Sequence, residues 1–505
     1  MSNNPATTYE KLCQHARQTA VLSSVADLLG WDEQTLLPAG GHDYRAEQLS
    51  LLAGLVHQRA TDPQIGSWLD ELSDSPLAAD PESDSAATLR ELRRTYDKRV
   101  RLPQALVEEL TRTATLAQAA WQEARRNDDY PHFAPWLEKI YKLKREEAAA
   151  TGTTDTAYDA LLDDYEPEMK TAEAAAMLDG LRAELVPLVQ AIAESGRAPD
   201  RALLERPYPV DVQEQFGREA SRRIGFDFER GRLDTSPHPF CSTSGPHDCR
   251  LTTRYDEHGF GDAFFSTLHE SGHGLYEQGL PTEHFGLPLG SAVSLGVHES
   301  QSRLWENLVG RSRAFWEYLY PELVKTFPTQ LKDVSLHDFY FAVNDVRPSL
   351  IRTESDEATY NLHICVRFEL ELALLNDELK VADLPAAWRD KYAEYVGIAP
   401  SNDADGVLQD IHWSGGLVGY FPTYSLGNLY AAQLYAQADR ELGGVDSFVR
   451  RGEFAPLLEW LREKVHRHGS RYRAVDLIRQ ASQSEPSAEP LMEHLRSKLT
   501  PLYGL

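Results

Sequence analysis

The stretch Phe264-Phe265-Ser266-Thr267-Leu268-His269-Glu270-Ser271-Gly272-His273 decides how the rest of the chain is interpreted. Apolar or small side chains recur around it at three- and four-residue spacing: Phe264, Leu268, Gly272 and Leu275. This periodicity predicts an α-helix with one buried face. We expect Asp262 to cap its N-terminus and Gly279-Leu280-Pro281 to end it, because these residue types favour helix boundaries.

Two histidines of this helix are placed to share one metal ion. His269 and His273 are four residues apart, so their imidazoles lie one turn apart on the same face. Such a pair can hold Zn²⁺, and Glu270 between them can reach a water bound to the metal. The stretch therefore predicts an HExxH metal site. Zinc is the expected ion, and Co²⁺ is expected to substitute for it.

The following helix offers a third ligand. Apolar side chains have helical spacing over residues 297–308, and Glu299 follows His273 at a distance that allows a turn and an antiparallel return. A His-His-Glu set leaves one tetrahedral position open, as catalytic zinc sites do. His298 points about 100° away from its neighbour around the helix, so we do not expect it to share the metal. The alternative is that Glu299 serves only as the ion-pair partner of Arg303.

These residue types support hydrolysis of a peptide bond. Zinc lowers the pKa of its bound water to about 7 and polarises a carbonyl group. Glu270 is the expected base, which takes the proton of the metal-bound water and passes it to the leaving amine. A phenol or imidazole donor beside the developing oxyanion contributes about 3 kcal/mol if it is well placed.

Composition and charge exclude several classes of protein. The 505 residues suffice for one large domain or for two to three ordinary ones, and 42% hydrophobic content is typical of globular proteins. A net charge of −27 argues against nucleic acid and anionic membrane as partners. The sequence contains no run of about eighteen apolar residues, so no transmembrane helix is expected. The acidic excess fits a salt-rich cytoplasm and equally an ordinary acidic bacterial surface.

The cysteines and the first residues predict a cytoplasmic protein. Residues 1–8 lack the basic, apolar and cleavage regions of a signal peptide. The four cysteines (Cys13, Cys241, Cys249 and Cys365) are too few and too scattered for a disulfide framework, and none forms a CxxC pair. Cys241 and Cys249 flank the site region, and we interpret them as ordinary buried thiols rather than redox partners.

Most of the chain has helical patterning. Two or three helices are predicted within 8–72, punctuated by Trp31-Asp32-Glu33 and by Pro38-Ala39-Gly40-Gly41. Further helices are predicted at about 86–128, 133–150, 170–195, 210–224, 311–327, 335–346 and 354–376. The strand-like pieces lie at 226–228, 232–234 and 249–255, just before the zinc helix. A strand beside that helix can pair with an extended peptide substrate.

Four further stretches are rich in polar groups that a core does not ordinarily contain. They are His238-Pro239-Phe240, Asp248-Cys249-Arg250-Leu251-Thr252, Ile351-Arg352-Thr353-Glu354-Ser355-Asp356 and Gly406-Val407-Leu408-Gln409-Asp410-Ile411-His412-Trp413. Simpler interpretations stay open for some of their members. His238 can cap a turn, and Arg250 can form a structural ion pair with Asp248.

With the HExxH stretch and His298-Glu299-Ser300-Gln301, this set closely resembles the carboxypeptidase Taq family of zinc metallocarboxypeptidases. The family motifs HPF, DxRxT, HExxH, HES-Q, IRxxAD and GxxQDxHW occur in the same order, with Ser355 where Ala is usual. Gly30-Trp31-Asp32-Glu33 and Arg45-Ala46-Glu47-Gln48-Leu49 also resemble the family, so the likeness spans almost the whole chain. It implies a helical fold like that of oligopeptidases, a cytoplasmic homodimer and broad carboxypeptidase activity.

The resemblance also implies roles for individual residues, carried over by position. His269, His273 and Glu299 match the zinc ligands, and Glu270 matches the catalytic glutamate. His412 and Tyr420 resemble a His/Tyr pair that contacts the substrate and stabilises the tetrahedral intermediate.

The remaining candidates concern the substrate's C-terminal carboxylate. Arg352 falls in the motif credited with holding it, and we expect the carboxylates within 354–356 to orient its guanidinium. The alternative is that Arg352 is only a member of that ion-pair network. His238 and Arg250 are further candidate substrate-binding residues.

We therefore expect a mainly α fold: a large helical two-lobed metallopeptidase with a deep central cleft and a small β-sheet beside the zinc helix. Residues 1–505 are expected to form this single domain. The expected function is zinc-dependent removal of single amino acids from the free C-terminus of peptides, with broad specificity. The alternatives are a zinc oligopeptidase or endopeptidase of the same architecture, and a helical interaction protein with a vestigial site. The presence of Glu270 and of all three ligand candidates argues against the last.

Overall fold

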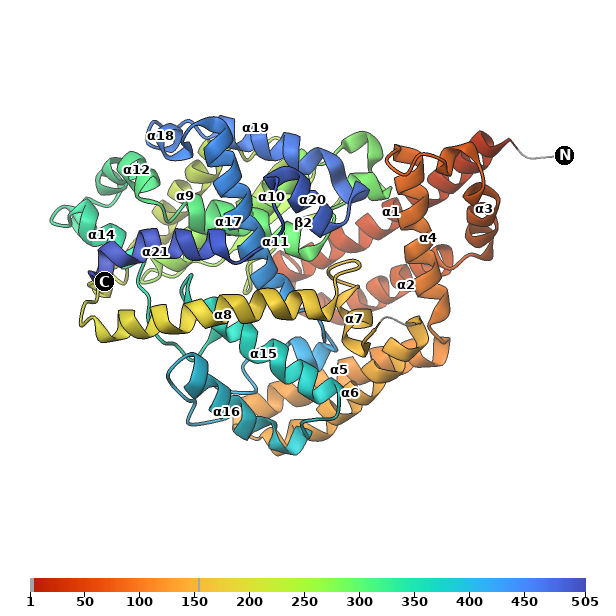
Figure 1. The fold of residues 1–505 in the computed structure, drawn as a ribbon, viewed down its shortest axis with the longest axis horizontal. Helices are drawn as coiled ribbons and strands as arrows, with labels where there is room; N and C mark the ends of the chain where they lie inside the picture. Colours follow the sequence, from red (N-terminus) through yellow and green to blue (C-terminus); the bar gives the residue numbers. More distant parts are fainter. Residues whose placement is uncertain (1–3, 153–154) are drawn as a thin grey trace. The chain divides into compact units, whose positions relative to one another are not determined.

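The computed structural model describes residues 4–152 and 155–505, and these residues are mainly helical with one small sheet (Figure 1). This confirms the predicted fold class, including the position of the sheet beside the helix that carries the HExxH motif. No helix within the described ranges is long and apolar enough to cross a membrane.

The chain divides into two compact units, each assembled from three separate segments. Unit 1 consists of Met1–Val100, Asp200–Val343 and Leu434–Glu485, and unit 2 of Arg101–Pro199, Asn344–Gln433 and Pro486–Leu505. The HExxH motif and the sheet belong to unit 1, and the IRxxAD-like and GxxQDxHW motifs belong to unit 2.

Unit 1 contains the sheet and the helices around it. Its α-helices are α1 (Pro5–Thr35), α2 (His42–Ala60), α3 (Pro63–Ser73), α4 (Asp84–Arg101), α9 (Val210–Ile224), α10 (Phe260–Gly279), α11 (Leu295–Arg303), α12 (Arg313–Thr326), α13 (Pro328–Leu331), α14 (Leu336–Val343), α18 (Val445–Val449), α19 (Ala455–Lys464) and α20 (Ala474–Ser482). A π-helical segment, η6 (Leu304–Val309), continues α11.

The regular elements of unit 2 are all helices within its described residues. It contains α5 (Gln104–Asn127), α6 (Tyr130–Thr151), α7 (Ala157–Leu162), α8 (Thr171–Glu194), α15 (Thr359–Leu375), α16 (Leu384–Tyr395) and α21 (Glu489–Tyr503). Helix α17 (Pro422–Leu442) begins in unit 2 and ends in unit 1. Two short 3-10 turns, η7 (Arg352–Glu354) and η9 (His412–Gly415), carry candidate site residues.

The sheet has three strands in the order β1-β3-β2. β1 (Gly231–Thr235) pairs in parallel with β3 (Cys249–Thr253), and β2 (Cys241–Thr243) pairs with β3 in antiparallel orientation. The sequence patterning misses β2 because three residues are too short to show an alternation. The segment 226–228, expected as a strand, forms none.

Helix α10 forms because its apolar residues repeat on one face and bury against aromatic side chains. Phe260 and Phe264 stack with ring centroids 5.5 Å apart, and Phe264 also contacts Phe216 of α9 and Trp316 of α12. Burial of each such ring contributes about 1.5–3 kcal/mol relative to leaving it exposed. This packing fixes which face of α10 remains for the polar residues.

Two predicted boundaries around the helices need correction. α10 begins at Phe260 with Gly259 as its N-cap, so Asp262 lies in the first turn, where a negative charge still favours the helix terminus. Its predicted end at Gly279 is confirmed. The helix predicted at 86–128 is divided into α4 and α5 before Gln104, because Pro103 lacks an amide hydrogen and restricts the residue before it.

Trp31 fixes α1 to the sheet. It lies within α1, so Trp31-Asp32-Glu33 does not separate two helices as expected. Arg232 of β1 and Arg250 of β3, which are partners in the strand register, lie with their guanidinium carbons 4.9 Å and 4.2 Å from the Trp31 ring centroid. Cation–π contacts of this kind contribute about 0.5–2 kcal/mol each.

Candidate metal centre

Helix α10 presents the two histidines of the HExxH motif side by side. The ring centroids of His269 and His273 are 4.9 Å apart, with the ring planes at 84°. Between them in sequence, Glu270 is buried. The four-residue spacing therefore has the consequence expected from helix geometry.

Glu299 of α11 completes the group. Its Oε2 lies 3.6 Å from Nε2 of His269 and 3.4 Å from Nε2 of His273. One ligand atom from each of these three residues lies within 4.8 Å of the others, which is close enough for one metal ion. The Glu299 carboxylate also forms the ion pair with Arg303 that was the alternative interpretation of the sequence, because its Oε1 accepts a hydrogen bond of 2.6 Å from Nε of Arg303.

The two helices meet closely because residue 272 is glycine. A Cβ on Gly272 would lie 2.6 Å from the carbonyl oxygen of Gln301 and from Cα of Ser302. Only a residue without a side chain permits that approach of α10 to α11. The approach brings Glu299 opposite the two histidines.

The second nitrogen of each candidate ligand is held by another group. Nδ1 of His269 lies 2.9 Å from Oε2 of Glu306, and Nδ1 of His273 lies 3.1 Å from the backbone oxygen of His298. Each Nδ1–H donates to an acceptor, so Nε2 is the nitrogen of each ring that faces Glu299 and is available to a metal ion. This is the tautomer that metal ligation requires.

The sequence did not single out Glu306, although it carried a signal for it. Glu306 lies seven residues after Glu299, so both face the same side of a continuous helix. It lies in the π-helical segment η6 and also contacts Arg303 and Arg311. Segments of this kind occur frequently at functional sites.

The neighbouring imidazole of His298 has a different partner. Its Nε2 lies 2.9 Å from Oε1 of Glu277, and its ring stacks on that of His273 with centroids 4.4 Å apart. His298 thus supports a candidate ligand through its ring and its carbonyl. It is absent from the metal-binding group found among the described residues, as the helix geometry predicts.

The charge balance of the group fits a cation. The carboxylates of Glu299 and Glu306 pair with the guanidinium groups of Arg303 and Arg311, and the carboxyl group of Glu270 is a third buried acid beside them. An added metal ion compensates the remaining negative charge. Nitrogen and oxygen donors in this number suit zinc and other first-row divalent metals.

Burial shifts the pKa values of the group in ways that suit these roles. Burial lowers the pKa of His273 to about 3, so its imidazole is neutral. Burial, reinforced by the charges of Glu299 and Glu306, raises the pKa of Glu270 to about 7. Although burial opposes ionisation of Glu299, Arg303 and the two imidazoles hold its pKa well below the usual range. Burial opposes protonation of His269 as well, but Glu299 and Glu306 raise its pKa, so a metal ion displaces a proton there. The Glu299 carboxylate and the neutral His273 imidazole are ready to bind a cation, with Glu270 near the pKa of a general base.

The candidate carboxylate anchor, Arg352, lies in unit 2 and is almost fully buried. Its Nε and Nη2 donate to Oδ1 of Asp410 at 3.0 and 2.8 Å, and its Nη1 donates to the hydroxyl of Tyr360 at 2.9 Å. Arg367, which the sequence did not indicate, binds Oδ2 of Asp410 at 2.6 Å. The two unit 2 motifs thus meet at the half-buried carboxylate of Asp410.

The expected holder of the Arg352 guanidinium is corrected by these contacts. Asp356 instead accepts hydrogen bonds from the backbone N–H groups of Ala358 and Thr359, at the start of α15. A carboxylate at a helix N-terminus satisfies backbone donors that lack partners in the helix. Asp410, 58 residues after Arg352 in sequence, orients the Arg352 guanidinium in place of the nearer carboxylates.

His412 and Tyr420 come together in unit 2. Their ring centroids are 5.3 Å apart, and Nε2 of His412 lies 3.3 Å from the hydroxyl of Tyr424. Burial lowers the pKa of His412 to about 4, so its imidazole is neutral. The pair can donate hydrogen bonds without carrying charge.

The two other candidate substrate-binding residues lie in unit 1. His238 is exposed, and its backbone oxygen accepts a hydrogen bond from Oγ of Ser236, as in a turn. Arg250 donates from Nε and Nη2 to the two oxygens of Asp248 at 2.8 and 2.9 Å. The ion pair expected for Arg250 is therefore present, whereas the His238 contact is made by its backbone and leaves the role of its imidazole a prediction.

Known proteins resemble this chain along its whole length. The sequence pattern of the carboxypeptidase Taq (M32) metallopeptidase family matches residues 11–499. Thermostable carboxypeptidase 1 of Thermus thermophilus is 49% identical over 99% of this chain and 100% of its own length. Carboxypeptidase 1 of Bacillus subtilis is 37% identical over 99% of both chains.

A solved structure agrees with the sequence relatives. The M32 carboxypeptidase from Deinococcus radiodurans R1 superposes with a TM-score of 0.96 at 42% identity, covering 99% of this chain and 100% of its own. Sequence, fold and the His-His-Glu group all point the same way. The chain belongs to the carboxypeptidase Taq (M32) family and is a metallocarboxypeptidase.

Proposed function

We propose that this metallocarboxypeptidase uses zinc, held by His269, His273 and Glu299, to remove single amino acids from the free C-terminus of peptides of varied sequence. The observation that carries the proposal is the arrangement of three ligand atoms within 4.8 Å of one another. Both imidazoles are held in orientation by the hydrogen bonds of their Nδ1 atoms. A zinc ion bound there supplies a Lewis acid that polarises the scissile carbonyl and makes water more acidic. Co²⁺ suits the same donors.

Glu270 is the proposed general base. Its burial and its pKa near 7 let it accept a proton from the attacking water and return one to the leaving amine at neutral pH. A bound cation lowers this pKa, which keeps Glu270 ionised before the reaction. Deprotonated Glu270 is therefore the resting state of the proposed mechanism.

The substrate's carboxylate needs a cationic partner, and Arg352 is the first candidate. Its guanidinium is fixed by Asp410 and Tyr360, so its orientation is set before any peptide arrives. Arg250, oriented by Asp248 over the Trp31 ring, is the second candidate. His238 is proposed as a further contact to the peptide.

His412 and Tyr420 are proposed to act on the developing oxyanion. A neutral imidazole or a phenol donates a hydrogen bond that strengthens as negative charge forms. Removal of one such donor costs about 10²–10³-fold in kcat.

Peptides that differ only at the C-terminus test the proposal. The zinc-loaded enzyme should release the last residue of a free-acid peptide and leave the amidated peptide intact, as mass spectrometry would show. Equal cleavage of both peptides, or cleavage within the chain, would identify the enzyme as a zinc oligopeptidase or endopeptidase instead. Static light scattering of the same sample tests the homodimer, which we keep as part of the proposal.

A further inference from the structure

Two cysteines face each other on the sheet beside the metal centre. β2 and β3 pair so that Thr243 lies opposite Cys249 and Cys241 lies opposite Leu251. Cys241 and Cys249 are therefore diagonal neighbours on one face of the sheet. Their Sγ atoms are 3.7 Å apart, and both thiols are free.

This separation matches a shared metal ion better than a disulfide. Two sulfurs at about 2.3 Å from one tetrahedral zinc lie about 3.8 Å apart, whereas a disulfide needs about 2.0 Å. Diagonal residues on antiparallel strands lie about 7–8 Å apart, which is at or beyond the reach of a disulfide without backbone movement. The strands thus hold the two Sγ atoms at the distance expected for two ligands of one metal ion.

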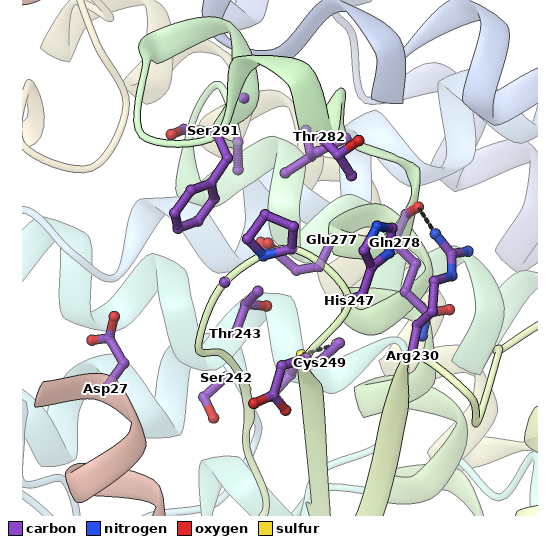
Figure 2. A pocket seen from close by; sticks show the side chains of 18 of the residues that line it. Asp27, Arg230, Ser242, Thr243, His247, Cys249, Glu277, Gln278, Thr282 and Ser291 are labelled. Atoms are coloured by element: carbon purple, nitrogen blue, oxygen red, sulfur yellow. Dashed lines mark hydrogen bonds between the residues drawn. The ribbon is translucent and has the colours of Figure 1, made fainter. Parts of the chain in front are cut away.

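A pocket of about 610 Å³ opens onto the two thiols. Its lining includes Ser242 and Thr243 of β2 and Glu277 of α10, and Figure 2 shows these side chains with Cys249 around the cavity. The hydroxyl oxygens of Ser242 and Thr243 are buried without a hydrogen-bond partner among the described residues. Thr243 lies on the same face of the sheet as the two thiols, whereas Ser242 lies on the opposite face, so the pocket has room for an ion and offers the Thr243 hydroxyl besides the sulfurs.

We propose that Cys241 and Cys249 form a second metal site, separate from the His-His-Glu group and selective for thiophilic d¹⁰ divalent ions such as zinc and cadmium. Soft sulfur ligands discriminate against magnesium and calcium, which prefer oxygen. Pocket oxygens and water complete the coordination. The two thiols release their protons to solvent as the two metal–sulfur bonds form.

The resting thiol of Cys241 is protonated. The neighbouring Cys249 thiol, together with burial, raises the pKa of Cys241. A metal ion displaces such protons, so binding weakens as the pH falls.

The site adjoins the metal centre through His298. This residue lines the pocket, and its ring stacks on that of His273 with centroids 4.4 Å apart. An ion on the thiols adds charge and bulk next to a proposed catalytic ligand. Excess zinc should therefore inhibit peptide hydrolysis, a consequence that rests on the proposed function.

Cadmium titration tests the site without reference to activity. The reduced protein, with its other metal site already loaded with zinc, is titrated with Cd²⁺ while the ultraviolet thiolate-to-cadmium charge-transfer band is recorded. Wild type should develop the band to one equivalent, and Cys241→Ser and Cys249→Ser should lose it. Cys13→Ser, which removes a buried thiol of α1, is the matched control and should keep it.

Three results would overturn the site. They are the absence of a band in wild type, a band of equal size in Cys241→Ser, and conversion of the pair to a disulfide that excludes cadmium, seen as the loss of two hydrogens by mass. Cys241→Ala repeats the measurement if the serine variant unfolds. Inhibition by excess zinc should vanish in Cys241→Ser and persist in Cys13→Ser. If the band behaves as expected but neither wild type nor Cys13→Ser hydrolyses peptides, the proposed function fails and the second site stands.

Discussion

Nδ1 of His269 lies 2.9 Å from Oε2 of Glu306, a carboxylate from the π-helical segment that follows α11. This bond fixes the ring and leaves Nε2 for the metal. Although burial opposes it, Arg303 and the His269 hydrogen bond lower the pKa of Glu306 to about 2, so the carboxylate stays charged.

Loss of that charge should weaken the metal centre. We predict that Glu306→Gln lowers zinc affinity by about 10–100-fold, because an amide is a weaker acceptor for the imidazole N–H. Competition with a chromophoric zinc chelator measures the change. Glu322→Gln removes a carboxylate paired with Arg223 on the same unit and should leave zinc affinity unaltered. Equal affinities in all three proteins would show that Glu306 does not support the ligand.

Metal removal should abolish activity reversibly. We predict that phenanthroline inactivates the enzyme and that Zn²⁺ or Co²⁺ restores it, since two imidazoles and one carboxylate accept either ion. Activity is followed alongside metal content by atomic emission. Full turnover in a metal-free sample would refute the zinc mechanism.

Glu270 should be required for turnover but not for metal binding. Glu270→Gln keeps the shape of the side chain and cannot accept a proton, so we expect kcat to fall by about 10²–10⁴-fold with zinc still bound. His273→Ala, by contrast, should lose the metal itself. Near-normal turnover of the zinc-loaded Glu270→Gln protein would contradict the proposed proton path.

Arg352 should distinguish a free carboxylate from an amide. If it anchors the substrate, Arg352→Ala loses about 2–5 kcal/mol in kcat/KM on free-acid peptides. Arg352→Lys should recover only part, because an ammonium cannot make the two-point contact. Wild type should discriminate strongly between free-acid and amidated peptides, and Arg352→Ala should not.

The contacts of Arg352 require a folding control for this prediction. Removing it leaves Arg367 as the remaining guanidinium partner of Asp410 among the described residues, so circular dichroism and zinc content must be compared first. If a folded Arg352→Ala protein still discriminates between free-acid and amidated peptides, another residue binds the substrate's carboxylate. Arg250→Ala is then the next variant.

Glu371 should make the stability depend on pH. Burial raises its pKa to about 7, above the value of 4.5 for an ordinary glutamate. The folded protein therefore keeps this proton after the unfolded chain has lost it, and stability decreases as the pH rises between those values. The full contribution is about 3 kcal/mol. Above the folded pKa the contribution is constant.

Urea unfolding of wild type and Glu371→Gln isolates this group from other titrating residues. The stability advantage of wild type over the variant should be larger at about pH 5 than at about pH 8. A difference that is the same at both pH values would show that Glu371 is ionised throughout.

The sequence predicts the metal group well because its geometry is local. A four-residue spacing on a helix is enough to place His269 beside His273, whatever the rest of the chain does. Helices α8 and α9 are likewise confirmed close to their predicted bounds, since each has a clear apolar period.

Contacts between distant segments are what the sequence does not predict. Asp410 holds Arg352 across 58 positions, although nearer carboxylates are the natural guess. Strand β2 is also missed, because its pairing with β3 depends on a tight turn rather than on a pattern of its own. The pairing of the Cys241 and Cys249 thiols follows from that strand, so spacing alone shows only two scattered cysteines.

The division of the chain also sets an order of events during synthesis. The residues of the metal centre leave the ribosome well before residues 434–485, yet both belong to unit 1. No contiguous fragment of the chain reproduces that unit, and a ribosome stalled after α11 carries the histidines without the segment that completes their surroundings. We therefore expect the complete surroundings of the metal group to form only after residues 434–485 have been synthesised, which makes metal loading a late step.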